Sequence, residues 1–275
     1  MAILPFAGDL FPQIRETTRE AGAMALGFFR RGERSAARAW SKAGGSPVTE
    51  ADVAVDAFLK VRLSEALPEA GWLSEETADD PTRLGRRLVW IVDPIDGTRA
   101  FIAGHPDWSV AVALLDDGRP RLGVVFAPAH DAFYEAERGA GARLNGAPIR
   151  TSAPENLPGI RVAGPKPQVE RLERQAGPVH RVERIPSLAL RLVRVADGSI
   201  DAGLVSSDSR DWDLAAADLI LAEAGGEVTD LEGRPLRYNR PDPIHGELLA
   251  SSRRLHPALI GAMTAHRRRA AAAGR

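Results

Sequence analysis

The stretch Leu88–Thr98 reads LVWIVDPIDGT and decides how the rest of the chain is interpreted. Its first five residues form a continuous apolar run, which is typical of a strand buried on both faces. Two carboxylates, Asp93 and Asp96, follow directly, with a proline that stiffens the turn between them. Gly97 and the threonine after it then open a predicted helix over Arg99–Ile102.

These residue types suit two kinds of ligand. Two hard oxygen donors on a rigid turn suit Mg²⁺, which prefers carboxylate and water ligands in near-octahedral geometry. Amide hydrogens at a helix start suit a phosphate, because unpaired N–H groups and the helix dipole both point towards it. The alternative is that Asp93 and Asp96 are turn and capping residues only, which are common uses of aspartate.

Three further acidic elements lie elsewhere in the chain. Glu75 follows the strand-like Gly71–Ser74, which would direct its side chain to a strand end. Asp211 and Asp213 begin a predicted helix; we expect one to be its N-cap and the other to project towards a cation. Asp52 completes a Thr-x-x-Asp capping box that opens another helix. Spacing alone does not distinguish four helix caps from one shared site.

The predicted organisation is mixed α and β. A helix is predicted from about Asp9 to Phe29, and a hairpin from the runs on either side of Asp116–Arg119. A composition shift near Thr151–Pro158 predicts an N-terminal α+β lobe, 1–150, with most metal ligands. The C-terminal α/β lobe, 151–275, would contribute Asp213 and the leaving-group pocket. Its predicted elements are strands at Gly159–Ala163, Arg181–Ile185 and Ala202–Val205, and helices at Leu188–Ala196 and Leu214–Ala224.

Composition excludes several classes of function. The 275 residues contain no cysteine, which excludes disulfides, thiolate zinc sites, iron–sulfur clusters and a cysteine nucleophile. Any metal is therefore held by carboxylates or by the six histidines. A net charge of -1 gives no basic footprint for a nucleic acid polymer. No apolar run approaches the roughly 20 residues of a membrane span, and Met1–Phe6 lacks the charged start of a secretion signal, so we expect a cytoplasmic protein.

Four segments together resemble the signature set of the inositol monophosphatase superfamily. They are DPIDGT (93–98), WLSEET (72–77), WDLAA (212–216) and EAGG (223–226), and the resemblance extends from Ser41 to about Arg240. Members of this superfamily are Mg²⁺-dependent, Li⁺-sensitive phosphomonoesterases. The resemblance implies a layered αβαβα sandwich, a homodimer, and a small phosphorylated metabolite as substrate.

The resemblance also implies a set of metal ligands. Glu75, Asp93 and the carbonyl of Ile95 would hold one Mg²⁺ ion. Asp93, Asp96 and Asp213 would hold a second, and Glu75 would help with a third, weaker site. Two cations about 3.5–4 Å apart can clamp the attacking and leaving oxygens of a phosphomonoester and lower the pKa of bound water. This chemistry fits the phosphate dianion, which otherwise repels hydroxide.

Catalytic and substrate-binding roles follow from the same resemblance. Thr98, with Asp52 behind its hydroxyl, would orient and deprotonate the attacking water, and Glu75 is the third residue expected to be catalytic. None of the histidines lies in these motifs; His105 is the nearest, and we interpret it as structural or substrate-adjacent. The residues expected to contact substrate are Gly97, Thr98, Asp96 and Asp213.

The substrate is open among three classes. The segment Ser41–Asp52 resembles bacterial 3'(2'),5'-bisphosphate nucleotidases, which favours adenosine 3',5'-bisphosphate. Inositol monophosphate is the alternative, although Ser206 stands where inositol phosphatases place a glutamate. Phe101–Pro106 resembles some histidinol-phosphate phosphatases, so histidinol phosphate or a sugar phosphate is the third class. Val162–Lys166 and Pro186-Ser187 depart from the usual pocket segments. A catalytically silent nucleotide-sensing protein is the non-enzyme alternative.

Overall fold

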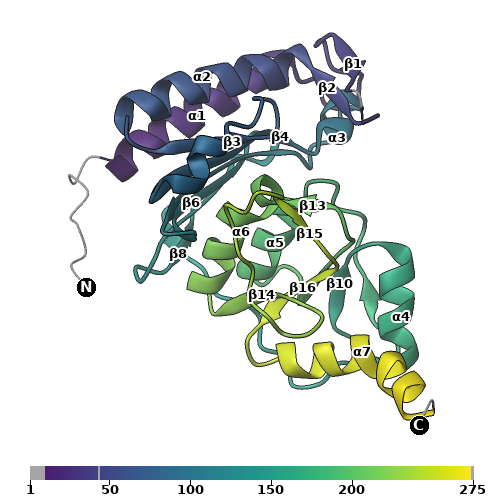
Figure 1. The fold of residues 1–275 in the computed structure, drawn as a ribbon. Helices are drawn as coiled ribbons and strands as arrows, with labels where there is room; N and C mark the ends of the chain where they lie inside the picture. The colour runs from purple at the N-terminus through teal and green to yellow at the C-terminus, as the bar shows by residue number, and fades with distance from the viewer. Residues whose placement is uncertain (1–9, 43, 274–275) are drawn as a thin grey trace.

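The computed structural model describes residues 10–42 and 44–273, with side chains up to residue 265. The chain builds five layers, helix–sheet–helix–sheet–helix, as predicted (Figure 1). No helix within these ranges is long and apolar enough to cross a membrane.

The first layer is a pair of helices, α1 (Leu10–Phe28) and α2 (Glu50–Ala66), which pack together over one face of the first sheet. The predicted helix from Asp9 to Phe29 is therefore present, and residue 9 lies outside the described residues. A short hairpin of β1 (Ala39–Ser41) and β2 (Pro47–Thr49) connects the two helices. Its two strands flank the turn that contains Gly44 and Gly45, and no strand was predicted there.

The first sheet has seven strands in the order β3-β4-β5-β6-β7-β8-β9. Only β3 and β4 are parallel; the other neighbours are antiparallel, and the β5–β6 hairpin forms at the predicted turn. The strands are β3 (Gly71–Ser74), β4 (Leu88–Asp96), β5 (Ser109–Asp116), β6 (Arg119–Ala127), β7 (Ala132–Glu137), β8 (Ala142–Leu144) and β9 (Ala147–Pro148), with η1 (Pro81–Gly85), α3 (Thr98–Ile102) and η2 (Pro128–His130) between them.

Strand β4 is buried on both faces because two separate cores meet at this sheet. Trp90 and Val92 belong to the core beneath α1 and α2, whereas Val89 and Ile91 belong to the core on the opposite face. Successive side chains of a strand point to opposite faces, so the continuous apolar run serves both cores. The same alternation directs Asp93 to the face that carries Val89 and Ile91.

That second face is covered by α5 (Leu188–Ala196) and α6 (Asp211–Glu223), which also pack on the second sheet. The second sheet has the order β11-β10-β12-β16-β14, and α4 (Lys166–Ala176) and α7 (His256–Ala273) lie together on its far side (Figure 1). Its strands are β10 (Arg161–Ala163), β11 (His180–Arg181), β12 (Ala202–Val205), β14 (Gly226–Asp230) and β16 (Leu248–Ser252); β13 (Ser209–Arg210) pairs separately with β15 (Ile244–His245).

Two sequence expectations about this part need correction. The strand expected over Arg181–Ile185 is only the two-residue β11, because its pairing with β10 ends after Arg181. The strand expected from Gly159 begins at Arg161. The chain leaves the first sheet at Pro148 and enters the second at Arg161, near the composition shift at 151–158. One continuous core nevertheless contains residues from before and after this crossing.

Candidate active site

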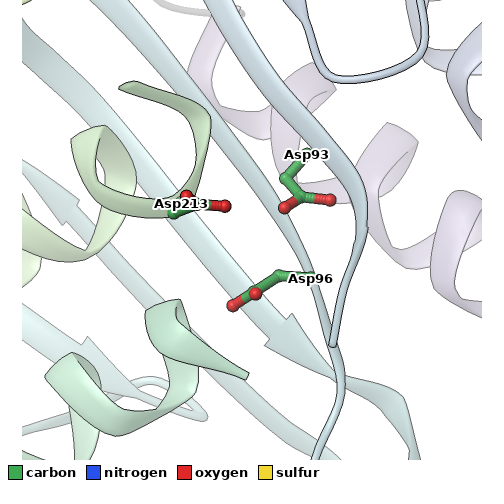
Figure 2. Close-up of side chains that lie close together, drawn as sticks. All are labelled: Asp93, Asp96 and Asp213. Carbon is green, nitrogen blue, oxygen red and sulfur yellow. The ribbon is translucent and has the colours of Figure 1, made fainter. Parts of the chain in front are cut away.

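Three carboxylates meet between the first sheet and α6. Oxygen atoms of Asp93, Asp96 and Asp213 all lie within 4.8 Å of one another, and Figure 2 shows the side chains converging from β4 and from α6. Asp93 and Asp96 are buried, and Asp213 is partly buried. The fold therefore joins two acidic segments that are far apart in the sequence.

Asp93 presents one free oxygen atom to this cluster. Its Oδ1 accepts a hydrogen bond from the Ile95 amide at 3.0 Å, which holds the turn after the apolar run. Its Oδ2 is buried and has no hydrogen-bond partner among the described residues. A buried oxygen without a partner carries a desolvation penalty, so it points to a ligand.

Asp96 is held from the opposite side by the start of α5. Its Oδ2 accepts hydrogen bonds from the Ser187 hydroxyl and the Ala189 amide, both at 2.6 Å. Ser187 is the N-cap of α5 and is fully buried. This residue was noted in the sequence only as a departure from the usual pocket, and its role as a partner of Asp96 was missed.

Asp213 is the third residue of α6, and its Oδ2 accepts from the Arg210 amide at 2.6 Å. The expectation that an aspartate is the N-cap is wrong, because the N-cap position belongs to Arg210. Asp211 instead starts the helix with a fully buried carboxylate that bonds His245 at 2.7 Å and the Asn239 amide at 2.8 Å. Only tertiary structure supplies these two partners.

The cluster is electrostatically strained without a cation. Burial and the charges of Glu75, Asp96 and Asp213 raise the pKa of Asp93 well above its ordinary value. Burial and the neighbouring carboxylates likewise raise the pKa of Asp213, even though Arg210 opposes the shift. Burial raises the pKa of Asp96 to about 6, despite its hydrogen bonds from Ser187 and Ala189. Like charges this close favour protonation or a bound cation.

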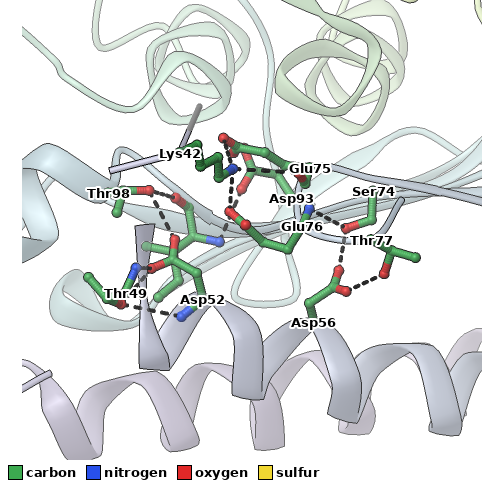
Figure 3. Close-up of polar contacts among 11 residues, drawn as sticks. Lys42, Thr49, Asp52, Asp56, Ser74, Glu75, Glu76, Thr77, Asp93 and Thr98 are labelled. Atoms are coloured by element: carbon green, nitrogen blue, oxygen red, sulfur yellow. Dashed lines mark hydrogen bonds and ion pairs between the residues drawn. The ribbon is translucent and has the colours of Figure 1, made fainter. Parts of the chain in front are cut away.

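Glu75 lies just beyond β3, beside this trio. Its amide donates to the Val92 carbonyl at 3.3 Å, so it follows the end of the strand as expected. Lys42 lies between Glu75 and Glu76, with its ammonium 2.8 and 2.7 Å from their carboxylates (Figure 3). Burial nevertheless raises the pKa of Glu76 to about 7. The sequence predicted no role for either Lys42 or Glu76.

Thr98 and Asp52 are in direct contact, as the resemblance implied. The Thr98 hydroxyl lies 3.0 Å from Asp52 Oδ1 and 3.0 Å from the Ile95 carbonyl (Figure 3). The other oxygen of Asp52 accepts from the Thr49 amide at 2.8 Å and from its hydroxyl at 2.5 Å. Asp52 therefore closes the predicted capping box at α2 and also contacts Thr98. Burial raises its pKa.

Gly97 connects the two parts of the site. Its backbone is left-handed, with φ of 92°, a conformation that glycine adopts without strain. A Cβ atom there would lie 3.3 Å from the Ser187 amide and 3.1 Å from the Asp107 carbonyl. His105 lies outside the carboxylate trio; its Nδ1 accepts from the Asp107 amide at 3.1 Å, which agrees with a structural role.

The arrangement fits a divalent cation that prefers oxygen. Asp93, Asp96 and Asp213 offer hard donors at one point, Asp93 Oδ2 is free, and the concentrated negative charge needs neutralisation. Glu75 lies near Asp93 as a further oxygen donor, and the Ile95 carbonyl accepts from the Thr98 hydroxyl. A phosphate would complete such a centre through its own oxygens, next to the amides of Gly97 and Thr98.

Comparisons with known proteins find relatives over most of the chain. The model of the Inositol monophosphatase family matches residues 12–268. The chain is 37% identical over 230 residues to a histidinol-phosphatase of Chlorobaculum parvum, covering 80% of this chain and 85% of the relative. It is 32% identical to the 3'(2'),5'-bisphosphate nucleotidase CysQ of Aggregatibacter actinomycetemcomitans, covering 84% and 88%. A solved inositol monophosphatase of Thermotoga maritima superposes with a TM-score of 0.80 at 27% identity, covering 93% and 97%.

Proposed function

This chain belongs to the inositol monophosphatase family and is a phosphomonoesterase, and we propose that it hydrolyses adenosine 3',5'-bisphosphate with the help of Mg²⁺. The observation that carries the reaction class is the trio of Asp93, Asp96 and Asp213 around the free Oδ2 of Asp93. The trio would bind cations, and these cations would neutralise the negative charge that otherwise keeps a phosphate dianion away from the carboxylates.

The proposed ligands of two to three Mg²⁺ ions are Asp93, Asp96, Asp213, Glu75 and the Ile95 carbonyl. When bound, Mg²⁺ would neutralise the phosphate and make a water ligand more acidic. Asp96 is oriented for this role by Ser187 and Ala189, which occupy its Oδ2. Lys42 would contribute a fixed positive charge beside Glu75 when the ions are absent.

Thr98 and Asp52 would handle the proton of the attacking water. The water oxygen forms a bond to phosphorus as the bond to the ester oxygen breaks. Its proton passes to Thr98 Oγ1, whose own proton moves to Asp52 Oδ1 at 3.0 Å. The raised pKa of Asp52 favours acceptance of that proton. The ester oxygen leaves as an alcohol after it takes up a proton from solvent.

Three observations support a bisphosphate nucleotide as the substrate. Ser206 provides no carboxylate for inositol hydroxyls. Arg210 stands immediately before α6, with its guanidinium 5.5 Å from the Trp212 ring, and its charge opposes the raised pKa of Asp213. A cation next to the trio suits a substrate that carries a second phosphate group. The similarity to the Aggregatibacter nucleotidase over 84% of this chain agrees with this choice.

Histidinol phosphate is the second candidate, because the Chlorobaculum relative named as a histidinol-phosphatase is 37% identical to this chain. The leaving group of this substrate is cationic, whereas that of the bisphosphate is anionic. The two substrates therefore differ in the charge of the group that would lie near Arg210. In either case the substrate is a small phosphorylated metabolite. We also propose that the protein is a homodimer, and sedimentation velocity would measure its oligomeric state.

The deciding experiment is phosphate release from four substrates at equal concentration, with Mg²⁺ and with added Li⁺. The substrates are adenosine 3',5'-bisphosphate, inositol 1-phosphate, histidinol phosphate and fructose 1,6-bisphosphate. We expect the highest kcat/KM with the nucleotide and inhibition by Li⁺. A higher kcat/KM with histidinol phosphate would replace the nucleotide by the second candidate. Phosphate release that is independent of Mg²⁺ would refute the reaction class as proposed.

A further inference from the structure

A buried arginine links the two acidic halves of the site from outside the carboxylate trio. Arg83 lies in η1, downstream of Glu75, and is 1% exposed. Its guanidinium donates to Asp79 through Nε at 2.5 Å and Nη2 at 2.8 Å. It also donates to Asn239 Oδ1 at 2.7 Å and to the Arg240 carbonyl at 3.1 Å. A charge buried this deeply requires such partners.

Asn239 lies in the segment 236–243, which leads from the turn after β14 to β15. Its side chain also donates to the Arg83 carbonyl at 3.2 Å, so the Arg83–Asn239 contact consists of two reciprocal hydrogen bonds. Its backbone amide points the other way and donates to Asp211 Oδ2 at 2.8 Å. One residue thus contacts both the segment after Glu75 and the first residue of α6.

Asp211 transmits this contact to the metal site. It is fully buried, and its second oxygen is held by His245 at 2.7 Å, so its carboxylate has a single well-defined position. Asp213 lies two residues further along the first turn of α6. A shift of the helix start would therefore move the Asp213 oxygen relative to those of Asp93 and Asp96.

We propose that Arg83 and Asn239 are positioning residues that set the distance between Asp213 and the carboxylates of the first sheet, and with it the affinity for Mg²⁺. This inference rests on the proposed function. Outer partners of metal ligands are worth about 10–100-fold in metal affinity in other proteins. Asn239 acts through Asp211, one step further away, so we expect an effect of about tenfold, at the low end of that range.

Asn239→Gly provides the cleanest test. Asn239 has a φ of 56°, which glycine also adopts, and the variant keeps the amide that donates to Asp211. It removes only the two side-chain bonds to Arg83. The readout is calorimetric: the Mg²⁺ concentration that gives the same fixed rise in melting temperature should increase about tenfold over wild type.

Leu259→Ala is the matched control. Leu259 is fully buried in the separate core around α4 and α7. Its truncation should lower the melting temperature without Mg²⁺ but leave unchanged the Mg²⁺ concentration that gives the same fixed rise in melting temperature. This control separates a loss of stability from a loss of metal affinity. A purely structural role for Asn239 would lower stability without lowering the affinity for Mg²⁺.

Arg83→Met provides an independent arm. It should weaken Mg²⁺ binding at least as much, because it removes the guanidinium bond to Asn239 Oδ1. Adding Asn239→Gly to it should cause a smaller further loss than Asn239→Gly causes alone, because only the bond from the Asn239 side chain to the Arg83 carbonyl is left to lose. Unchanged Mg²⁺ affinity in Asn239→Gly would overturn the inference while leaving the proposed function intact. A wild-type melting temperature that does not change with Mg²⁺ would overturn both the inference and the proposed function.

Discussion

Replacing Asp93 with asparagine should stabilise the metal-free protein while abolishing its response to Mg²⁺. Asp93 Oδ1 accepts the Ile95 amide, so the amide oxygen of asparagine would take that position. The NH₂ group would then occupy the place of the free Oδ2, where it can donate to the neighbouring carboxylates. The substitution removes a repelling charge and adds a donor at the same point.

The size of the effect follows from the carboxylate separation. For full negative charges 4.8 Å apart, an effective dielectric constant of about 20 gives about 3.5 kcal/mol of repulsion per pair. Because their pKa values are raised, Asp93 and Asp96 take up protons more readily than free aspartates do, which reduces the repulsion that is actually removed. We therefore expect a gain of about 1–3 kcal/mol, or about 2–10 °C in melting temperature for a chain of this size.

The assay is differential scanning calorimetry of wild type and Asp93→Asn in EDTA at mildly alkaline pH, repeated with saturating Mg²⁺. Asp107→Asn is the control, because this buried carboxylate is paired with Arg194 at 2.6 Å and His130 at 2.8 Å. Although burial opposes it, these partners hold the pKa of Asp107 below its usual value. The control should lower the melting temperature and keep the Mg²⁺ response. A metal-free Asp93→Asn protein that melts below wild type, or phosphatase activity that persists in it, would refute the reasoning.

Three further outcomes are expected. Thr98→Ala should lower kcat by about 10²–10⁴ and keep the Mg²⁺-induced rise in melting temperature; an unchanged kcat would remove the hydroxyl from proton transfer. Arg210→Ala should raise KM for adenosine 3',5'-bisphosphate while leaving KM for inositol 1-phosphate unchanged, measured by phosphate release; equal changes would exclude Arg210 from recognition of the second phosphate. Metal-free stability should rise as the pH falls through the pKa of Glu76, about 7, and of Asp96, about 6, because both pKa values are raised in the folded state. His256 opposes this trend, because burial lowers its pKa to about 4. The test therefore compares how the melting temperature changes with pH in the absence of Mg²⁺ and at a high, fixed Mg²⁺ concentration. Equal pH slopes of the melting temperature under the two conditions would contradict the prediction.

The sequence predicted the parts of the site that local chemistry determines. The apolar run before Asp93 predicted a strand buried on both faces, and two separate cores meet at β4. The capping box predicted the start of α2, where Asp52 has both a local and a distant partner. Local sequence could not separate these two roles, because a cap and a contact with Thr98 require the same carboxylate.

The errors and omissions all involve partners that are distant in the sequence. Asp211 resembled an N-cap, but its carboxylate is satisfied by Asn239 and His245. The Ser187 hydroxyl donates to Asp96 from the start of α5, which belongs to another layer. Lys42, which directly follows β1, lies between Glu75 and Glu76, and no strand was predicted there. No periodicity or spacing encodes these contacts, which exist only once the sheets and helices have packed together.

The place of Asp213 at the start of α6 also determines when the site can exist during synthesis. Asp93 and Asp96 leave the ribosome long before Asp213, and the segment that holds Asp211 follows later still. A partly made chain therefore has only part of the carboxylate trio, and Asp213, the last of the three, arrives with the helix that packs between the two sheets. Completion of the trio, and with it the proposed binding of Mg²⁺, thus becomes a late event of folding, coupled to the assembly of all five layers.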